Sequence, residues 1–318
     1  MRRMTNGKKR VFSGIQPSGT LHIGNYFGAL KQWIEMAEEF DSIYCLVDYH
    51  ALTTVKDPAL LRKHTLEGAK DLLAIGISPE KSILFAQSSV SEHTELAWVF
   101  ECLVTVPFLM QAHAYKDKVA KGLEANAGLF NYPMLMAADI LLYDTDLVPV
   151  GADQKQHVEY AREAAAKFNT AFGETFKEPQ EKILDSVAVV PGTDGQKMSK
   201  SYGNTIPLFG TKDEIAKAVM SIVTDSSGER PTNVYAIHKL LKSEAELAPL
   251  YDANKGSYKA LKESLIEDLD DFIAPMREKR AALSDEEVKR TLNEGGLKAK
   301  AIASAKMKDV REKIGVTL

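Results

Sequence analysis

Up to about residue 200 the chain alternates short apolar runs with longer segments of helical periodicity. One of the helical segments is bounded by Asp57 as N-cap, Pro58 as first helical residue and Gly76 at its end. Strands that alternate with helices predict a parallel sheet with helices on both of its faces. The strands expected from the apolar runs are 11–15, 42–48, 82–87, 146–150 and 187–190.

This alternation stops at two places. Residues 107–130 are polar and rich in lysine, which indicates an insertion that joins the two halves of the sheet. Beyond about residue 205 the strand pattern ends, and capping residues such as Thr211 and Ser284 predict helices. The sequence therefore predicts an α/β domain followed by an all-helical domain.

Two short segments carry the most informative chemistry. Residues 21–25, Leu-His-Ile-Gly-Asn, follow a predicted strand and a turn, and they open a helix whose backbone N–H groups suit a triphosphate. Residues 197–201, Lys-Met-Ser-Lys-Ser, bring lysines and hydroxyls into a loop, as closure over a leaving pyrophosphate would need. Taken singly, each segment could also be an ordinary helix start or an ordinary solvated loop.

The glycines near the first strand argue against one common class of nucleotide-binding protein. They stand at positions 14, 19 and 24, so no Gly-x-Gly-x-x-Gly pattern follows the strand. This spacing argues against a dinucleotide-dependent oxidoreductase.

A third informative segment is the apolar helix expected over 131–143, with Pro133 at its first helical position. Tyr132, Met136 and Asp139 fall on one face of that helix. A carboxylate in such apolar surroundings costs several kcal/mol unless it finds a donor. Asp139 therefore either caps or salt-bridges another part of the fold, or it serves a ligand.

Residues 148–157 are expected to form a strand, a turn and a helix. Asp153 fits the N-cap of that helix, with Gln156 at its third position, so this segment also has a purely structural interpretation. His50, a lone histidine after a strand, is equally ambiguous.

Composition narrows the function classes. The chain has 318 residues, 45% of them hydrophobic and 26% charged, as in soluble globular proteins. No apolar run reaches transmembrane length, and residues 1–10 lack the apolar stretch of a secretory signal, so we expect a cytoplasmic protein without a membrane segment. Cys45 and Cys102 lie in apolar runs, which predicts buried thiols and offers no zinc or iron–sulfur framework.

The net charge of −4 is unusual for a protein that coats nucleic acid. Local basic patches at 116–121 and 298–313 could still contact RNA, although mixed-sign helices more often present a solvated face.

Together, residues 21–25 and 197–201 resemble the two signatures of the class I aminoacyl-tRNA synthetases. The second matches in full, and the first departs only at Asn25, a change also seen in the tryptophanyl branch. Residues 151–157 are similar to the Gly-x-Asp-Gln-x-x-His motif of that branch, in which His157 favours tryptophanyl over tyrosyl enzymes. The resemblance covers roughly residues 10–290.

The resemblance implies a Rossmann-like catalytic domain, residues 1–205, and a helical anticodon-binding domain, residues 206–318. It implies a ligase that activates L-tryptophan with ATP, releases pyrophosphate and transfers the amino acid to tRNA(Trp). It also implies a homodimer. Mg²⁺ is expected to be bound mainly through the ATP phosphates, without a metal site built by the protein, because no carboxylate cluster offers a cage.

The same resemblance assigns site residues. The catalytic set is His22, Lys197 and Lys200. ATP is expected at Gln16, Pro17, Ser18, Gly24, Asn25, Gly151, Ala152, Asp153, Lys197, Met198, Ser199, Lys200 and Ser201. Tryptophan is expected at Gln16, His50, Tyr132, Met136, Asp139 and Gln154, with Asp139 accepting the indole N–H.

Two alternatives stay open. A tyrosyl-tRNA synthetase shares both signatures, and a synthetase-like paralogue could bind RNA or protein without catalysis. Such paralogues commonly lose a signature residue, whereas this chain keeps His22, Lys197 and Lys200. The chain also has Tyr202-Gly203-Asn204 where the family often has Asp, which leaves the dynamics of this loop open.

Overall fold

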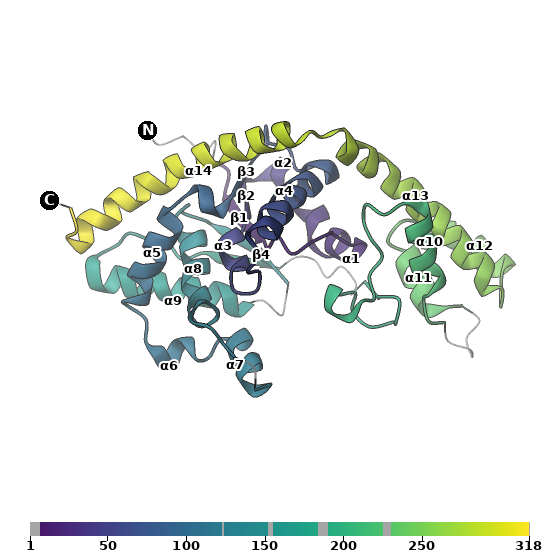
Figure 1. Cartoon of the computed structure of the whole chain (residues 1–318), viewed down its shortest axis with the longest axis horizontal. Coiled ribbons are helices and arrows are strands. Elements are labelled where there is room, and N and C mark those ends of the chain that lie inside the picture. Colours follow the sequence, from purple (N-terminus) through teal and green to yellow (C-terminus); the bar gives the residue numbers. More distant parts are fainter. Residues whose placement is uncertain (1–6, 123, 152–154, 184–189, 225–229, 318) are drawn as a thin grey trace.

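In the computed structural model, a parallel sheet with its covering helices is joined to a group of helices on one side (Figure 1). The structure describes residues 7–122, 124–151, 155–183, 190–224 and 230–317. The strands are β1 (Arg10–Ile15), β2 (Asp41–Leu46), β3 (Ser82–Ala86), β4 (Leu147–Val150) and β5 (Gln180–Ile183). Their order is β3-β2-β1-β4-β5, with every pairing parallel.

Four of the expected strands are confirmed, and the chain forms one more that the pattern did not predict. β5 has the sequence Gln-Glu-Lys-Ile and lies at the edge of the sheet beside β4, where its side chains stay partly or fully exposed. Because an edge strand needs no apolar run, hydrophobic periodicity missed it. The strand expected at 187–190 falls almost wholly outside the described residues.

Helices connect the strands and form the rest of the chain. In the sheet region they are α1 (Ile23–Asn25), α2 (Lys31–Glu39), α3 (Asp48–Ala51), α4 (Pro58–Ile75), α5 (Glu92–Glu101), α6 (Val106–Leu109), α7 (His113–Ala120), α8 (Ala127–Leu141) and α9 (Lys155–Phe172), with a π-helical turn at Tyr26–Leu30. Beyond the sheet they are α10 (Lys212–Met220), α11 (Thr232–His238), α12 (Glu244–Ala253), α13 (Tyr258–Ala282) and α14 (Asp285–Ile314). No helix in the described ranges is long and apolar enough to cross a membrane.

Local capping explains where these helices begin. Asp57 caps α4 and Gly76 ends it in the left-handed conformation, as the sequence predicts. The start of α8 was predicted wrongly, because the helix begins at Ala127 and Pro133 lies inside it. The Asn126 side chain accepts a hydrogen bond from the Leu129 N–H at 2.8 Å and starts the helix earlier.

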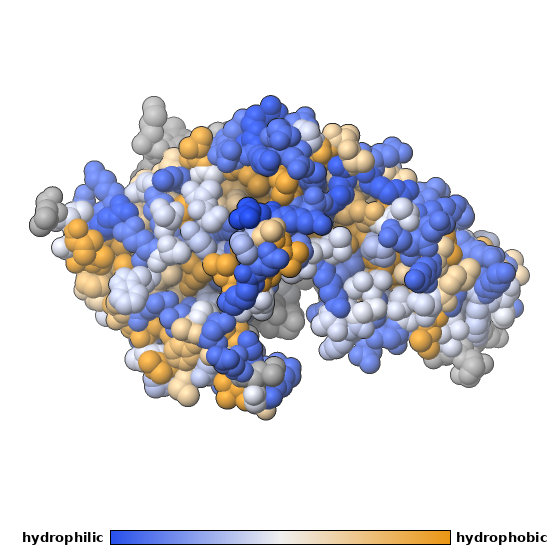
Figure 2. All heavy atoms as spheres, in the orientation of Figure 1, coloured by the Kyte–Doolittle hydropathy of each residue, from blue (hydrophilic) through white to orange (hydrophobic). Residues whose placement is uncertain are grey.

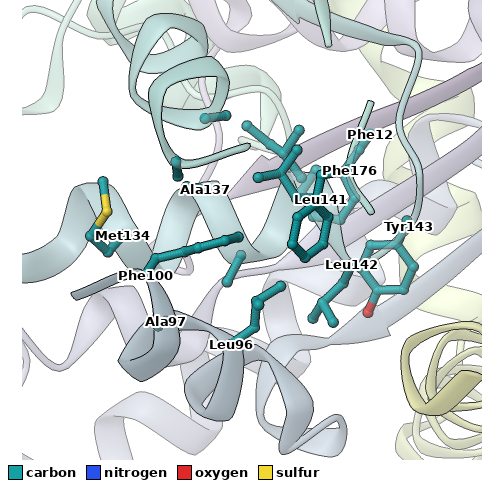
Figure 3. Packing of buried hydrophobic residues seen from close by; sticks show 14 of the residues in the cluster. Phe12, Leu96, Ala97, Phe100, Met134, Ala137, Leu141, Leu142, Tyr143 and Phe176 are labelled. Atoms are coloured by element: carbon teal, nitrogen blue, oxygen red, sulfur yellow. The ribbon is translucent and has the colours of Figure 1, made fainter. Parts of the chain in front are cut away.

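The sheet is buried on both faces. Along β2, Ile43 and Cys45 point into one hydrophobic cluster, while Tyr44 and Leu46 point into the other. Figure 3 shows part of the first cluster, in which side chains of α5 and α8 pack against Phe12 and its neighbours. The central strands are thereby fixed on both sides, and their carboxyl ends are held in place.

α14 returns from the helical group and lies against β3 (Figure 1). A Cβ atom on Gly295 would come within 1.9 Å of the Leu84 carbonyl oxygen, so this approach requires glycine. The last helix thus packs on the sheet, although it follows the expected domain boundary.

One prediction about the cysteines is wrong. Cys45 is buried in β2 as expected, but Cys102 is exposed because it caps the carboxyl end of α5.

Candidate active site at the carboxyl edge of the sheet

The candidate site residues follow the strands at the middle of the sheet. The chain proceeds from β1 to β2 and β3 on one side, and later to β4 and β5 on the other. The neighbours β1 and β4 therefore form the topological switch point, where ligands of open α/β sheets bind at the carboxyl ends of the strands. Residues 16–19 follow β1, residues 48–50 follow β2 and Gly151 follows β4.

The first signature forms the turn that begins α1. The His22 backbone is extended, and its N–H donates to Asn25 Oδ1 at 3.1 Å. Asn25 thus fixes the helix start through its side chain, which gives a structural reason for asparagine at this place. The Ile23 and Asn25 N–H groups at this start already donate to the carbonyl oxygens of Ile206 and His22.

His22 is buried, 6% exposed, and its Nδ1 has no hydrogen-bond partner in the structure. Burial and the neighbouring charge of Lys200 lower the pKa of His22 to about 4. The ring is therefore neutral at pH 7. It can offer a hydrogen bond to a phosphate oxygen, but it brings no positive charge.

The second signature forms a tight loop. Met198 N donates to the Val190 carbonyl oxygen at 3.0 Å, and residues Lys200–Tyr202 make a 3₁₀ turn that ends at Gly203. The buried Asn204 side chain accepts from the Ser199 N–H at 2.8 Å and donates to Asp194 Oδ1 at 2.7 Å. Asn204 thus organises this loop.

Lys200 crosses from the second signature to the turn before the first. Its Nζ donates to the carbonyl oxygens of Ser18 at 3.1 Å and Gly19 at 3.0 Å. Desolvation lowers the pKa of Lys200, and the negative charge of Asp71 opposes this effect. These bonds use two of the three donors of the ammonium, so the third can bind a phosphate oxygen.

Backbone pairing also ties the first signature to residues 206–208, which follow the second signature. Ile23 N donates to the Ile206 carbonyl oxygen at 3.1 Å, and Leu208 N donates to the Leu21 carbonyl oxygen at 3.0 Å. A Cβ atom on Gly24 would lie 2.9 Å from His22 Nδ1 and 3.2 Å from Met198 Cβ. Any larger residue at Gly24 would therefore push the signatures apart.

A second group of site residues surrounds Asp139 on α8. Its Oδ1 accepts from Gln87 Nε2 at 2.7 Å and from His93 Nδ1 at 2.6 Å, while His50 Nε2 lies 2.9 Å from Oδ2. His93 Nε2 lies 2.7 Å from the Tyr143 hydroxyl oxygen. The polar side chains thus form one network inside an apolar cluster.

This network keeps Asp139 ionised although its side chain is almost fully buried. Burial raises the pKa of Asp139, but the charges and hydrogen bonds of His93 and His50 outweigh burial and lower it to about 2. Tyr132 lies beside the network. Its ring centroid is 6.4 Å from that of His50 and 6.2 Å from that of His157. Met136 is half-buried on the same helix and packs against the core.

The structure thus collects the expected residues into two clusters. One holds the described phosphate residues of both signatures, and the other holds His50, Tyr132, Met136 and Asp139. Gln16 and Ser18 are exposed on the turn, Pro17 is buried, and Gly151 is half-buried after β4. The expected site residues Ala152, Asp153 and Gln154 lie outside the described residues.

Gln87, His93 and Asn204 were missed by sequence reasoning. Gln87 and His93 come from the end of β3 and from α5, distant from Asp139 in the chain. The signal in the sequence was the Asp139 carboxylate on an apolar helix, which requires hydrogen-bond donors. The sequence does not indicate which residues supply them. Within the described ranges, no group of three histidine, cysteine or acidic side chains is arranged to hold a metal ion.

Comparison with known proteins gives the family. The model of the tRNA synthetases class I (W and Y) matches residues 4–307. The tryptophan–tRNA ligase of Fusobacterium nucleatum is 48% identical over 97% of this chain and 98% of that protein, and the one of Rhodopirellula baltica is 46% identical over 96% and 99%.

Solved structures agree with the sequence relatives. The tryptophanyl-tRNA synthetase of Campylobacter jejuni, complexed with ADP and tryptophan, superposes with a TM-score of 0.91 at 44% identity, covering 96% of this chain and 99% of that one. The Mycoplasma pneumoniae enzyme gives 0.84 at 31% identity, covering 96% and 98%. The fold, the paired signatures and these relatives agree: the chain belongs to the class I tRNA synthetases of the tryptophan and tyrosine branch.

Proposed function

We propose that this chain is a tryptophan–tRNA ligase, which joins L-tryptophan to AMP and then to tRNA(Trp). The observation that carries the proposal is the ionised Asp139 carboxylate, buried beside Tyr132 and Met136 at the edge of the sheet that also holds the phosphate residues. The relatives at 48% and 46% identity, both tryptophan–tRNA ligases, favour tryptophan over tyrosine.

In the first step the substrate supplies its own nucleophile. The tryptophan carboxylate, ionised at pH 7, attacks the α-phosphorus of ATP, and the bond from that phosphorus to the bridging oxygen breaks. Tryptophanyl-AMP forms and pyrophosphate leaves with the bonding electrons. No protein base or covalent enzyme intermediate is needed, so catalysis comes from positioning and from charge stabilisation.

The phosphate residues match this requirement. His22 at the start of α1 has a ring nitrogen, Nδ1, without a hydrogen-bond partner, and this nitrogen suits a group with many acceptor oxygens. Lys197 and Lys200 neutralise the charge that grows on pyrophosphate. Mg²⁺ fits the same chemistry, because it keeps phosphate and water ligands and needs no dedicated protein cage.

Asp139 suits an indole better than a phenol. The indole N–H is a donor without acceptor capacity, so a carboxylate that can only accept is its complement. His50 engages Oδ2, and a carboxylate oxygen retains a second lone pair for the ligand. Met136, on the same helix, supplies polarizable surface for the ring.

In the second step a ribose hydroxyl of tRNA(Trp) attacks the tryptophanyl carbonyl, and AMP leaves. We assign residues 1–205 to catalysis and residues 206–318 to a helical anticodon-binding part. The placement of α10, α11 and α12 away from the sheet supports this division (Figure 1), while α14 packs back on β3. The expected cytoplasmic location agrees with the relatives being bacterial tRNA ligases.

A homodimer completes the proposal. The exposed apolar residues Trp98, Val106 and Met110, at 66%, 62% and 48% exposure, lie on or next to α5 and α6. Trp98 also lines a cavity of about 640 Å³ between α3, α5 and α8. Figure 2 shows further apolar side chains gathered on this part of the surface. A second copy would cover this region. A sedimentation mass of one chain at micromolar concentration would contradict the dimer.

ATP–pyrophosphate exchange with each of the twenty amino acids tests the central proposal. We expect exchange with tryptophan alone. Exchange driven by tyrosine at comparable efficiency would support the tyrosyl alternative. Exchange with no amino acid would support the non-catalytic paralogue.

A further inference from the structure

α13 carries two arginines that reach the framework of the phosphate site. Arg277 Nη1 donates to the Gly210 carbonyl oxygen at 2.7 Å. The Arg280 guanidinium lies 5.3 Å from the centroid of the Phe209 ring. Gly210 and Phe209 directly follow residues 206–208, which pair with the first signature. The arginines therefore connect a helix of the C-terminal half to the segment beneath the ATP site.

Arg280 also reaches the catalytic half directly. Its Nε donates to Asp71 Oδ1 at 2.5 Å, and its Nη2 donates to Glu67. Both carboxylates lie on α4, and Asp71 is only 1% exposed. A buried carboxylate without a partner would be strongly destabilising, so Arg280 is what makes Asp71 tolerable at this position.

Asp71 acts on both signatures. Its carboxylate faces the backbone N–H of Leu21, the residue before His22, and this N–H helps to lower the pKa of Asp71. Burial raises the pKa of Asp71, while the hydrogen bond and charge of Arg280 oppose this rise. The negative charge of Asp71 also influences Lys200 of the second signature. One buried side chain thus faces the turn of the first signature and supplies a counter-charge to the second. The same ion pair reaches this turn through Phe209, because its neighbour Leu208 donates to the Leu21 carbonyl oxygen at 3.0 Å.

We propose that Arg280 is a positioning residue for the ATP site, acting through Asp71 on the Leu21 turn and on Lys200. Neither residue touches the substrate in this assignment. Their pairing fixes the turn that presents His22 and Gly24, and it holds a negative charge where Lys200 must remain protonated. The inference rests on the proposed use of ATP, but it concerns residues outside both signatures.

The consequence is selective. Loss of the pair should loosen the phosphate end and leave the Asp139 pocket unchanged, because the hydrogen bonds of Arg280 join it to Asp71 and Glu67 and to none of the residues around Asp139. A purely structural link would instead lower stability and affect ATP and tryptophan alike.

The decisive variant is the double replacement Asp71→Leu with Arg280→Met. Replacing both members of a buried ion pair by apolar residues of similar size is often tolerated, whereas removing one member is not. We expect a melting temperature close to that of the wild type. We expect kcat/KM for ATP in tryptophan-dependent exchange to fall about five- to tenfold, with the KM for tryptophan within about twofold.

Two further variants secure the reading. Arg280→Lys keeps the positive charge but loses the planar guanidinium that bonds both carboxylates. It should therefore lower kcat/KM for ATP by less than the double variant does, again without changing the KM for tryptophan. If the double variant does not fold, this single variant tests the proposal. Arg290→Met, at an exposed arginine on α14, is the matched control and should change neither substrate parameter.

Affinity for a non-hydrolysable ATP analogue, measured by calorimetry without tryptophan, separates this inference from the proposed function. A weaker affinity in the variants supports positioning even if the wild type catalyses no exchange, which would be a failure of the proposed function alone. Wild-type ATP parameters in a folded double variant overturn the inference. Equal losses for ATP and tryptophan overturn it too.

Discussion

The phosphate end and the amino-acid end of the proposed active site are built in opposite ways. At the phosphate end, His22 has an unpaired ring nitrogen, and Lys200 rests on the carbonyl oxygens of Ser18 and Gly19. At the amino-acid end, Asp139 is already held by Gln87, His93 and His50. The first end keeps hydrogen-bonding capacity for its ligand, whereas the second is organised in advance. Catalysis needs charged groups that bind more strongly as the transition state forms. Selection of the amino acid needs a charge that is already fixed in position before the substrate binds.

The largest effect should come from Lys200→Ala, which breaks the phosphate end alone. Charge on pyrophosphate grows in the transition state, so the lysine binds that state better than the ground state. We expect kcat for pyrophosphate exchange to fall about 10²-fold, with the KM for tryptophan within about twofold. Lys217→Ala, at an exposed lysine on α10, is the control. Equal loss in kcat and in affinity for ATP would make Lys200 a ground-state contact.

Asp139→Asn should break the amino-acid end. An amide must turn its N–H₂ group toward one of the donors around it, either a protein donor or the indole N–H. A charge-assisted hydrogen bond is worth roughly 1.5–3 kcal/mol, so kcat/KM for tryptophan should fall about ten- to hundredfold. The KM for ATP should change little. Asp213→Asn, on the exposed face of α10, serves as control, and an unchanged tryptophan constant would remove Asp139 from the pocket.

The pH dependence of stability should sharpen the comparison. The pKa of His22 is about 4 in the folded chain and 6.5 in the reference state, so between these values the unfolded chain binds a proton that the folded chain does not. Stability from this residue is therefore lost as the pH falls, by about 2 kcal/mol at pH 5. Asp139, with its pKa lowered to about 2, stays charged through that window.

Denaturant unfolding of His22→Gln at pH 7 and pH 5 measures this effect. The variant should lose less stability than the wild type on acidification, by about the same 2 kcal/mol. Parallel pH profiles for the two proteins would show that the His22 ring is already protonated, or equally exposed, in the folded state.

The smallest effect should come from the helical part. Lys239 is exposed after α11, whereas Lys242 is already paired with Asp268 at 2.6 Å and is a poorer probe. If Lys239 contacts a tRNA phosphate, Lys239→Glu should weaken tRNA binding and reduce the slope of log affinity against log salt by about one. Adenylate formation should stay unchanged. An unaltered salt slope across the exposed basic residues of 206–318 would confine tRNA contacts to the catalytic part.

Much of the framework could be read from the chain because its causes are local. Apolar runs gave four strands, Asp57 and Gly76 bounded α4, and Ser284 caps α14 through its predicted box with Glu287. The failures have local causes too. β5 is a polar edge strand, and the cap at Asn126 started α8 before the proline that was expected to start it.

In the candidate site too, features that depend on local sequence could be predicted, and contacts between distant residues could not. The sequence by itself determined the two signatures, the parallel sheet that presents them and the carboxylate on an apolar helix, because residue type and spacing carry these features. Only the tertiary structure decided which donors hold Asp139, that Lys200 lies on the turn after β1, and that Arg280 of α13 pairs with Asp71 of α4. Those contacts join residues 46, 182 and 209 positions apart, and no periodicity along the chain encodes such a meeting.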